Sequence, residues 1–187
     1  MAQLITAWDV SVLEWIQENL RVGILVPLMK GITHLGDSGI FWIALVVLLL
    51  FFKRTRKAGA VAAVSVAVCY VIVNLLIKPL AARPRPYDLF PAVQLIIERQ
   101  ADASFPSGHA ANGFACSLVL LRMLPKKAGV PLVILAAVIS FSRLFVGVHY
   151  PSDVIAGFLI ALAVSQLTWY FASSSARCLP FRSCDRS

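Results

Sequence analysis

Three short segments hold most of the side chains that can bind an anion or transfer a proton, and each lies at the edge of an apolar run. In the first segment, Lys78 ends an apolar run and Arg85 follows it inside the sequence Arg83-Pro84-Arg85-Pro86. The prolines oppose a regular helix and favour an extended backbone, which holds the cations near one another. Such a pair suits phosphate oxygens, and the alternative is that both side chains reach toward lipid headgroups.

The second segment is Pro106-Ser107-Gly108-His109, at the start of another apolar run. Proline is favoured in the first turn of a helix, where the backbone N–H groups have no intrahelical partner. Such an N-terminus binds anions, and His109 adds a proton donor beside it. The alternative for this segment is a plain helix start.

In the third segment, Arg143 lies near the end of an apolar run, where an unpaired charge is costly and by default indicates function. His149 precedes a helix start marked by Pro151, and Asp153 lies in the first turn of that helix. A carboxylate at this spacing can orient the imidazole of His149 and make it a better nucleophile. The alternative for Asp153 is helix capping.

Together these segments supply three cations, two helix N-termini, two histidines and a carboxylate. Phosphoryl transfer needs charge stabilisation around three oxygens, an in-line nucleophile and an acid, which this set provides. Metal binding is the rival hypothesis, but the chain has only nine acidic residues and none of them cluster beside the histidines. Lysine and arginine would also repel a cation, so we expect no metal and no other cofactor.

The composition indicates how these segments are positioned. Of 187 residues, 59% are hydrophobic and 14% are charged, and the mean hydropathy is +0.82. A soluble domain would carry about 25% charged residues, so an integral membrane protein is predicted. The net charge of +8 would suggest nucleic-acid binding in a soluble protein, but here the basic residues flank apolar runs. Four cysteines do not make a disulfide framework, and we expect them to be reduced.

The apolar runs predict an all-α fold, a polytopic membrane helix bundle. A transmembrane helix needs about 20 residues, and runs 39–52, 58–77, 107–124, 130–148 and 154–172 predict about five. The first twenty residues are read as an amphipathic interfacial helix, with Trp8 and Trp15 on the apolar side and Asp9 on the polar side. We therefore expect interfacial N-terminal helices over 1–36, a membrane-embedded phosphatase domain over 37–174 and a cytoplasmic tail over 175–187.

The basic residues are distributed unevenly between the two ends of these runs. Five spans place alternate connectors on opposite sides, and one side collects ten of the seventeen basic residues: Lys53, Arg54, Arg56, Lys57, Arg122, Lys126, Lys127, Arg177, Arg182 and Arg186. The positive-inside rule makes that side cytoplasmic. The three chemical segments then share the extracytoplasmic surface of the membrane.

The three segments also resemble a known family. The patterns Lys78-x6-Arg85-Pro86, residues 106–109 and Ser142-Arg143-x5-His149-x3-Asp153 match the three-part signature of the type 2 phosphatidate phosphatase superfamily without departure. Within it, the chain is similar to small bacterial lipid phosphatases, particularly undecaprenyl-diphosphatases. The signature spans residues 78–153.

The resemblance implies a role for each matching residue. His149 would be the nucleophile, Asp153 would orient it, and His109 would protonate the leaving group and later activate water. The phosphate would be held by Lys78, Arg85, Ser107, Gly108 and Arg143. Three further residues match no fixed motif position and are expected to support the site or tune the substrate: Arg83, Tyr87 and Asp88. Arg83 is expected nearest a phosphate that is not transferred.

The sequence therefore predicts a metal-independent integral membrane lipid phosphatase, with undecaprenyl diphosphate as the expected substrate. A phosphatidylglycerophosphate or phosphatidate phosphatase is the alternative, and a small membrane transporter is the non-enzymatic one. A transporter would place its polar groups at the midplane of the membrane, whereas here they share one surface. The expected partners are the lipid substrate and membrane lipids, with no nucleic acid and no obligate protein partner.

Overall fold

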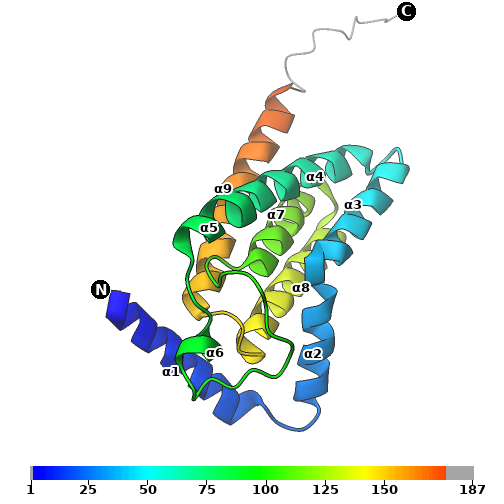
Figure 1. The fold of residues 1–187 in the computed structure, drawn as a ribbon. Helices are drawn as coiled ribbons and strands as arrows, with labels where there is room; N and C mark the ends of the chain where they lie inside the picture. The colour runs from blue at the N-terminus through cyan, green and yellow to red at the C-terminus, as the bar shows by residue number, and fades with distance from the viewer. Residues whose placement is uncertain (1, 176–187) are drawn as a thin grey trace, which may run out of the picture.

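In the computed structural model, which describes residues 2–175, the chain folds into helices that pack around a central one (Figure 1). The all-α membrane bundle predicted from the sequence is confirmed. The helices are α1 (Ala2–Leu20), α2 (Leu25–Leu35), α3 (Ile40–Phe51), α4 (Arg56–Tyr70), α5 (Lys78–Ala81), α6 (Pro86–Leu89), α7 (Gly108–Met123), α8 (Lys126–Phe145) and α9 (Pro151–Ser175). A 3-10 turn (Asp37–Gly39) joins α2 to α3, and a π-helical stretch (Val71–Ile77) joins α4 to α5.

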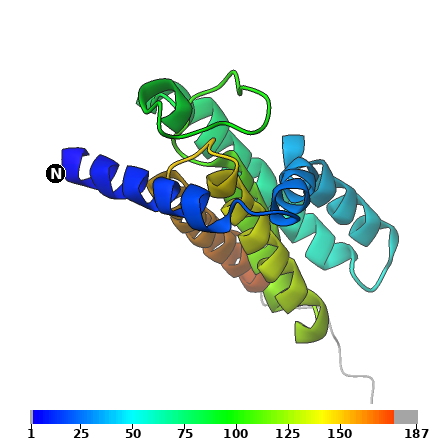
Figure 2. The same ribbon diagram turned by 90° about the horizontal axis from the view of Figure 1, so that it is seen from below.

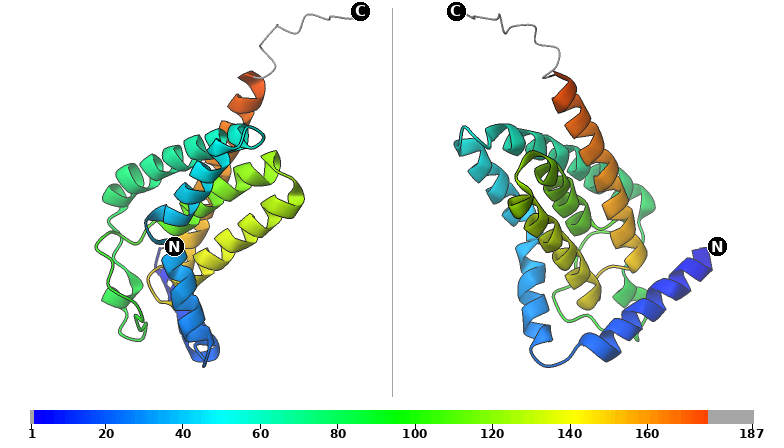
Figure 3. Two further views of the ribbon diagram at one scale, coloured as in Figure 1. Left: turned by 90° about the vertical axis from the view of Figure 1, so that its right-hand side faces the viewer. Right: turned by 180° about the vertical axis from the view of Figure 1, so that it is seen from behind.

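The central helix is α7, which packs against α4, α8 and α9 (Figure 3). Its buried positions are mostly small residues, so the neighbouring backbones approach closely. A Cβ atom at Gly157 of α9 would lie 2.6 Å from the carbonyl oxygen of Ser107, just before α7 begins. This close approach sets the start of α7 beside the first turns of α9, where Asp153 lies.

The outer surfaces of the bundle are apolar. Large aliphatic side chains on α3, α4 and α9 are about half exposed, for example Ile43, Val64 and Leu159. A water-soluble domain would cover such faces, whereas lipid tails match them. The outer surface therefore agrees with a multi-pass membrane protein.

The spans differ in detail from the five expected runs, although all five runs form helices. Within residues 2–175, three segments are long and apolar enough to cross a membrane: Arg56–Leu89, Lys126–Phe145 and Pro151–Ser174. Helices α2 and α3 meet at a 52° bend and make a fourth if they count as one broken span. Helix α7 has only 16 residues, and most of them are buried among the other helices.

The N-terminal helices lie at one end of the bundle. Helix α1 crosses this end near the start of α9, and the loop between α6 and α7 lies at the same end (Figures 1 and 2). Leu13 and Ile16 of α1 are buried against the protein, while Trp8 and Trp15 are half exposed. Asp9 was expected on the polar side, but it is completely buried. The predicted tail 175–187 lies outside the described residues except for its first position.

Candidate active site

The three chemical segments meet at the end of the bundle that α1 crosses. Lys78 follows the π-helical stretch, Arg85 immediately precedes α6, and Arg143 lies in the last turn of α8. All three cationic side chains are buried, with 7% exposure or less. Three buried cations within one small region can be tolerated only beside anionic or hydrogen-bonding partners, which makes the region an anion site.

Carboxylate and neutral oxygens surround these cations. Asp102 forms ion pairs with Lys78 and, at 2.6 Å, with Arg85 Nη2. Arg85 Nη1 donates to the carbonyl oxygen of Val148 at 2.8 Å. Arg143 Nη1 donates to Thr33 Oγ1 at 2.7 Å, and its Nη2 lies 3.4 Å from Gln100 Oε1.

A phosphate that bound to both Lys78 and Arg85 would have to displace Asp102 from them. Its side chain is half exposed on the loop before α7, so it can move away more easily than the buried cations. Burial by itself raises the pKa of the Asp102 carboxyl, but the hydrogen bond and charge of Lys78, with the charge of Arg85, hold that pKa at about 2. Asp102 consequently remains an anion, and it occupies Lys78 and Arg85 as a phosphate oxygen would.

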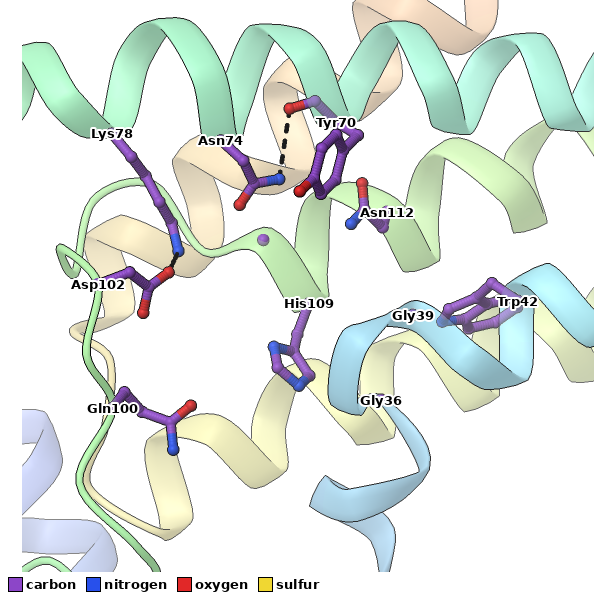
Figure 4. A pocket seen from close by; sticks show the side chains of 11 residues that line it. Gly36, Gly39, Trp42, Tyr70, Asn74, Lys78, Gln100, Asp102, His109 and Asn112 are labelled. Atoms are coloured by element: carbon purple, nitrogen blue, oxygen red, sulfur yellow. Dashed lines mark hydrogen bonds and ion pairs between the residues drawn. The ribbon is translucent and has the colours of Figure 1, made fainter.

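The start of α7 forms another wall of the site. Ser107 is buried, its N–H donates to the carbonyl oxygen of Asp153 at 3.0 Å, and its side chain caps the helix at Ala110. His109 projects into the site from the first turn of α7 (Figure 4). Its Nε2 lies 3.2 Å from Asp37 Oδ1. The same Asp37 oxygen lies 3.7 Å from Arg143 Nη1. His109 and Arg143 thus share a carboxylate.

His149 and Asp153 lie behind this wall, at the connection between α8 and α9. His149 is 1% exposed, and its Nδ1 lies 3.5 Å from Asp153 Oδ2. The same Asp153 oxygen accepts a hydrogen bond from Ser104 Oγ at 2.5 Å and from the backbone N–H of Tyr150 at 3.0 Å. Because Nδ1 faces the carboxylate, Nε2 is the ring nitrogen left for other chemistry. The 3.5 Å between His149 Nδ1 and Asp153 Oδ2 is long for a hydrogen bond, and such distances often shorten when a substrate binds.

Burial lowers the pKa of His149 to about 3; its hydrogen bond to Asp153 opposes this shift, while the charges of Arg85 and Arg143 add to it. The imidazole is therefore neutral at neutral pH, with a lone pair available. An unfolded histidine has a pKa of about 6.5, so below that pH the unfolded chain takes up a proton that folded His149 does not.

The folded state should consequently lose stability as the pH falls from about 6.5 toward 3, by on the order of 1 kcal/mol per pH unit from this residue. We expect the melting temperature in detergent to fall between pH 6.5 and pH 5 and to change little between pH 7 and pH 8. His149→Gln should make the acid decline shallower. An equally steep decline in this variant would contradict the account of His149.

The cavity beside these groups has a volume of about 300 Å³. Figure 4 shows Lys78, Asn74 and Tyr70 on one side of it and Gln100 and Asp102 on the loop side. The remaining lining residues come from the α2–α3 connection, from α3 and from the start of α7: Gly36, Gly39, Trp42, Gly108, His109 and Asn112. Arg85 and Arg143 do not line the cavity, but each contacts a residue that does, Asp102 and Gln100 respectively, whereas His149 is buried and outside the lining.

The three additional candidates lie around the site rather than in the cavity. Arg83 bonds to Asp153 and Asp9, so it lies behind His149 and does not line the cavity where a second phosphate was expected. The hydroxyl of Tyr87 accepts a hydrogen bond from the backbone N–H of Gln100 at 3.1 Å. Asp88 pairs with Arg99 at the surface. The last two contacts secure the loop that carries Gln100 and Asp102.

Several residues at the site were missed by sequence reasoning. Three of them are carboxylates that each pair with a predicted site residue: Asp9, Asp37 and Asp102. The hydroxyl of Ser104 donates a hydrogen bond to Asp153, and that of Thr33 accepts one from Arg143. Ser104 had a signal, because it lies just before the Pro106–His109 segment. The carboxylates had none, since each comes from a segment remote in sequence from the residue it contacts.

Buried cations, a helix N-terminus and two histidines at one end of a membrane bundle define a membrane protein that acts on a phosphate group. The family model of the PAP2 superfamily matches residues 58–177. The chain belongs to this superfamily, as its signature indicated, and it is a membrane lipid phosphatase of that kind.

Two of the similar relatives are named for polyprenyl lipids, and others are named for lipid A or phosphatidylglycerophosphate. The chain is 34% identical over 161 residues to an undecaprenyl-diphosphatase of Sulfolobus acidocaldarius. This alignment covers 86% of this chain and 77% of the relative. The chain is 33% identical over 171 residues to a decaprenylphosphoryl-5-phosphoribose phosphatase of Mycobacterium tuberculosis, covering 89% of this chain and 92% of the relative.

Solved structures share the fold. LpxE of Aquifex aeolicus superimposes with a TM-score of 0.77 at 25% identity, covering 86% of this chain and 94% of that one. A transmembrane PAP2-type phosphatidylglycerolphosphate phosphatase of Bacillus subtilis gives a TM-score of 0.65 at 25% identity, covering 92% and 88%.

Proposed function

We propose that the protein hydrolyses undecaprenyl diphosphate to undecaprenyl phosphate, through a phosphohistidine on His149. The observation that carries the substrate is that the phosphate cavity continues into an apolar groove. Four residues line both spaces: Gly39, Trp42, Tyr70 and Asn112. A lipid can thus place its phosphate among the cations while its tail leaves the site between helices.

The groove lies between α3 and α4 and has a volume of about 470 Å³. Beyond the four shared residues, every side chain that lines it is aliphatic: Ile43, Val46, Val47, Ala63, Val66, Ala67 and Val71. Ile43 and Val47 are about half exposed on the outer surface of the bundle. The groove therefore opens toward the lipid, where a long tail can enter sideways.

The junction between cavity and groove suits a diphosphate followed by hydrocarbon. Trp42 Nε1 and Asn112 Oδ1 are buried there without a hydrogen-bond partner among the described residues. The indole N–H can donate to an oxygen of the phosphate that is retained. Beyond it the aliphatic groove offers only carbon, which matches an isoprenoid better than the two ester groups of a glycerolipid. Two relatives named for polyprenyl substrates support the same class.

In the mechanism that we propose, Nε2 of His149 attacks the terminal phosphorus while Asp153 holds the imidazole at Nδ1. Lys78, Arg85 and Arg143, with the hydroxyl of Ser107 and the N–H of Gly108, stabilise the three phosphoryl oxygens. His109 donates a proton to the oxygen that leaves with undecaprenyl phosphate. It then takes a proton from the water that attacks the phosphohistidine, which releases inorganic phosphate and restores His149.

We propose that the reaction needs no metal ion, because the three cations supply the charge stabilisation. Among residues 2–175, no three His, Cys, Asp or Glu side chains are grouped so that they could hold a metal ion. We therefore expect full activity in the presence of EDTA. Activity that appears only on addition of Mg²⁺ would contradict this part of the proposal.

The substrate is tested by measuring kcat/KM for four lipids in matched detergent micelles: undecaprenyl diphosphate, decaprenylphosphoryl-5-phosphoribose, phosphatidylglycerophosphate and phosphatidate. We expect the diphosphate to be preferred. A tenfold preference for any other lipid, about 1.4 kcal/mol in the transition state, would move the assignment to that lipid.

Trp42→Phe makes this test sharper, since it removes the indole N–H at the junction and keeps an aromatic ring. We expect kcat/KM for undecaprenyl diphosphate to fall roughly 10- to 150-fold, the effect of losing one hydrogen bond to a charged group. Activity toward undecaprenyl phosphate or another monophosphate should change less. Equal losses on both substrates would show that Trp42 does not contact the retained phosphate.

We also propose that the site opens on the extracytoplasmic side of the bacterial cytoplasmic membrane, with residues 1–36 in the interface and 37–174 embedded. Seven of the ten basic residues that mark the cytoplasmic side lie within the described residues, at the α3–α4 and α7–α8 connections. The site lies at the opposite end of the bundle from these connections. The positive-inside rule therefore supports an outward-facing site.

This orientation predicts which introduced cysteines an impermeant thiol reagent labels in intact cells. Glu98 on the loop before α7 and Lys126 at the start of α8 are both exposed. With Cys178 and Cys184 replaced by Ser, Glu98→Cys should react, and Lys126→Cys should react only after the cells are made permeable. The reverse pattern would overturn the orientation.

A further inference from the structure

Helix α1 carries a fully buried carboxylate, Asp9, although much of the helix surface is exposed. Asp9 Oδ1 accepts a hydrogen bond from the backbone N–H of Ser152 at 2.9 Å. Its Oδ2 accepts from Ser152 Oγ at 2.5 Å and from Arg83 Nη2 at 2.9 Å. A carboxylate is buried at this cost only where its partners are well placed, so these contacts fix α1 against the first turn of α9.

The guanidinium of Arg83 lies between two carboxylates. Its Nη2 binds Asp9, and its Nη1 donates to Asp153 Oδ1 at 2.6 Å and to Ser152 Oγ at 2.8 Å. The guanidinium carbon also lies 3.8 Å from the ring centroid of Tyr150, which is buried beneath it. Arg83 is thus held from three sides, and its charge is divided between α1 and the carboxylate that faces His149.

We propose that Asp9 is a positioning residue for the Asp153–His149 pair, acting through Arg83 and Ser152. The inference rests on the proposed function, and it extends the site to a helix outside the residues 58–177 that the family model matches. Helix α1 is on this account part of the catalytic apparatus as well as a membrane-surface element.

The physical reason is competition for the oxygens of Asp153. Oδ1 is bound by Arg83, while Oδ2 serves Ser104, the N–H of Tyr150 and, at 3.5 Å, His149 Nδ1. Without Asp9, the positive charge of Arg83 has Asp153 as its one remaining carboxylate partner among the contacts described. The guanidinium then draws Asp153 away from the imidazole, which loses its orientation.

Asp9→Asn should therefore lower kcat and leave substrate binding unchanged. We expect kcat on undecaprenyl diphosphate to fall roughly 10- to 100-fold, the range seen when a carboxylate that orients a functional histidine is disturbed. KM and the inhibition constant of inorganic phosphate, the product, should stay within about twofold. Neither Asp9 nor Arg83 lines the cavity, so neither should alter binding directly.

The matched control is Glu18→Gln, which makes the same charge change at an exposed position on the same helix. It should behave as the wild type in kcat, KM and melting temperature. A double-mutant cycle with Arg83→Gln tests the route, because Asp9→Asn should cost much less kcat once Arg83 is absent. If Asp9→Asn does not fold in detergent, Arg83→Gln, which removes the competing charge and leaves Asp9 its bonds to Ser152, should keep kcat within about tenfold of the wild type, and a larger loss at constant KM would contradict the competition for Asp153.

Asp153→Asn and His149→Ala separate the two levels of the argument. If these variants are impaired and Asp9→Asn has wild-type kcat, the role of Asp9 is overturned and the proposed function stands. A loss that is shared by kcat, KM and phosphate binding would also overturn it, because general distortion would then explain the result. If Asp153→Asn and His149→Ala both turn over at wild-type rates, the proposed function itself is wrong.

Discussion

His149→Ala should abolish turnover, with no phosphate release above the background of a micelle without enzyme. The side chain is the proposed nucleophile, and a methyl group cannot form the covalent intermediate. Removing a nucleophile of a catalytic set typically costs as much as removing the whole set. The measurement is phosphate release from undecaprenyl diphosphate under single-turnover conditions, where slow product release cannot mask the chemical step.

Two controls keep this result interpretable. The variant should elute as a folded protein and should still bind inorganic phosphate, because Lys78, Arg85 and Arg143 are unchanged. Since a buried histidine is removed, a lowered melting temperature is expected and does not count against the prediction. Residual turnover within tenfold of the wild type would exclude His149 as the nucleophile.

His109→Ala should slow turnover about 10²- to 10⁴-fold on undecaprenyl diphosphate and much less on an activated aryl phosphate. General-acid catalysis is worth this much when the leaving group needs a proton, and little when it departs unaided. His109 lies at the cavity wall, whereas His149 is buried behind it, so the two variants should differ in this respect. The ratio of rates on the two substrates is the quantity to measure.

Equal losses on the two substrates would argue against His109 as the acid. Asp37→Asn is a useful companion, because Asp37 contacts His109 Nε2 but lies outside the signature. If His109 donates its proton from the side that Asp37 now occupies, the substrate must displace Asp37, as it must displace Asp102. Asp37→Asn should then weaken neither the aryl phosphate reaction nor phosphate binding.

The helices could be predicted, as could the positions of the candidate site residues at helix ends, because both depend on local sequence. Apolar runs of near-membrane length form helices whatever their neighbours, and all five did. Residues 106–109 and 149–153 each begin a helix, so a few adjacent residues determine where their side chains point. The spacing of Lys78 and Arg85 is similarly constrained by the prolines around Arg85.

The partners of these residues could not be predicted, because they depend on how distant segments pack. Asp9 belongs to a pattern with Glu14, Gln17 and Glu18 that indicates a polar helix face. Periodicity cannot distinguish a carboxylate that faces water from one that faces a guanidinium 74 residues later in the chain. Asp102 is on an irregular loop, where neither period nor capping fixes the direction of a side chain.

The sequence also does not predict which helices are long enough to cross the membrane, or where a span is broken. Helix α7 is shorter than a span, but its small residues let α4, α8 and α9 surround it, so lipid does not set its length. The bend between α2 and α3 occurs at a run that includes Gly36 and Gly39, and Gly39 has a φ of +67° that glycine adopts readily. Composition alone does not show how such a break divides a span.

The central claim is that phosphate passes through His149. It is tested most directly by rapid acid-free quenching of the enzyme with undecaprenyl diphosphate labelled with ³²P at the terminal phosphate, followed by peptide mapping. The account predicts a base-stable, acid-labile label on the peptide that contains His149. With a labelled aryl phosphate the label should accumulate in His109→Ala, whose hydrolysis step lacks its base, and it should be absent from His149→Ala. Label on any other residue, or phosphate released by the wild type with no labelled enzyme at any quench time, would contradict the account.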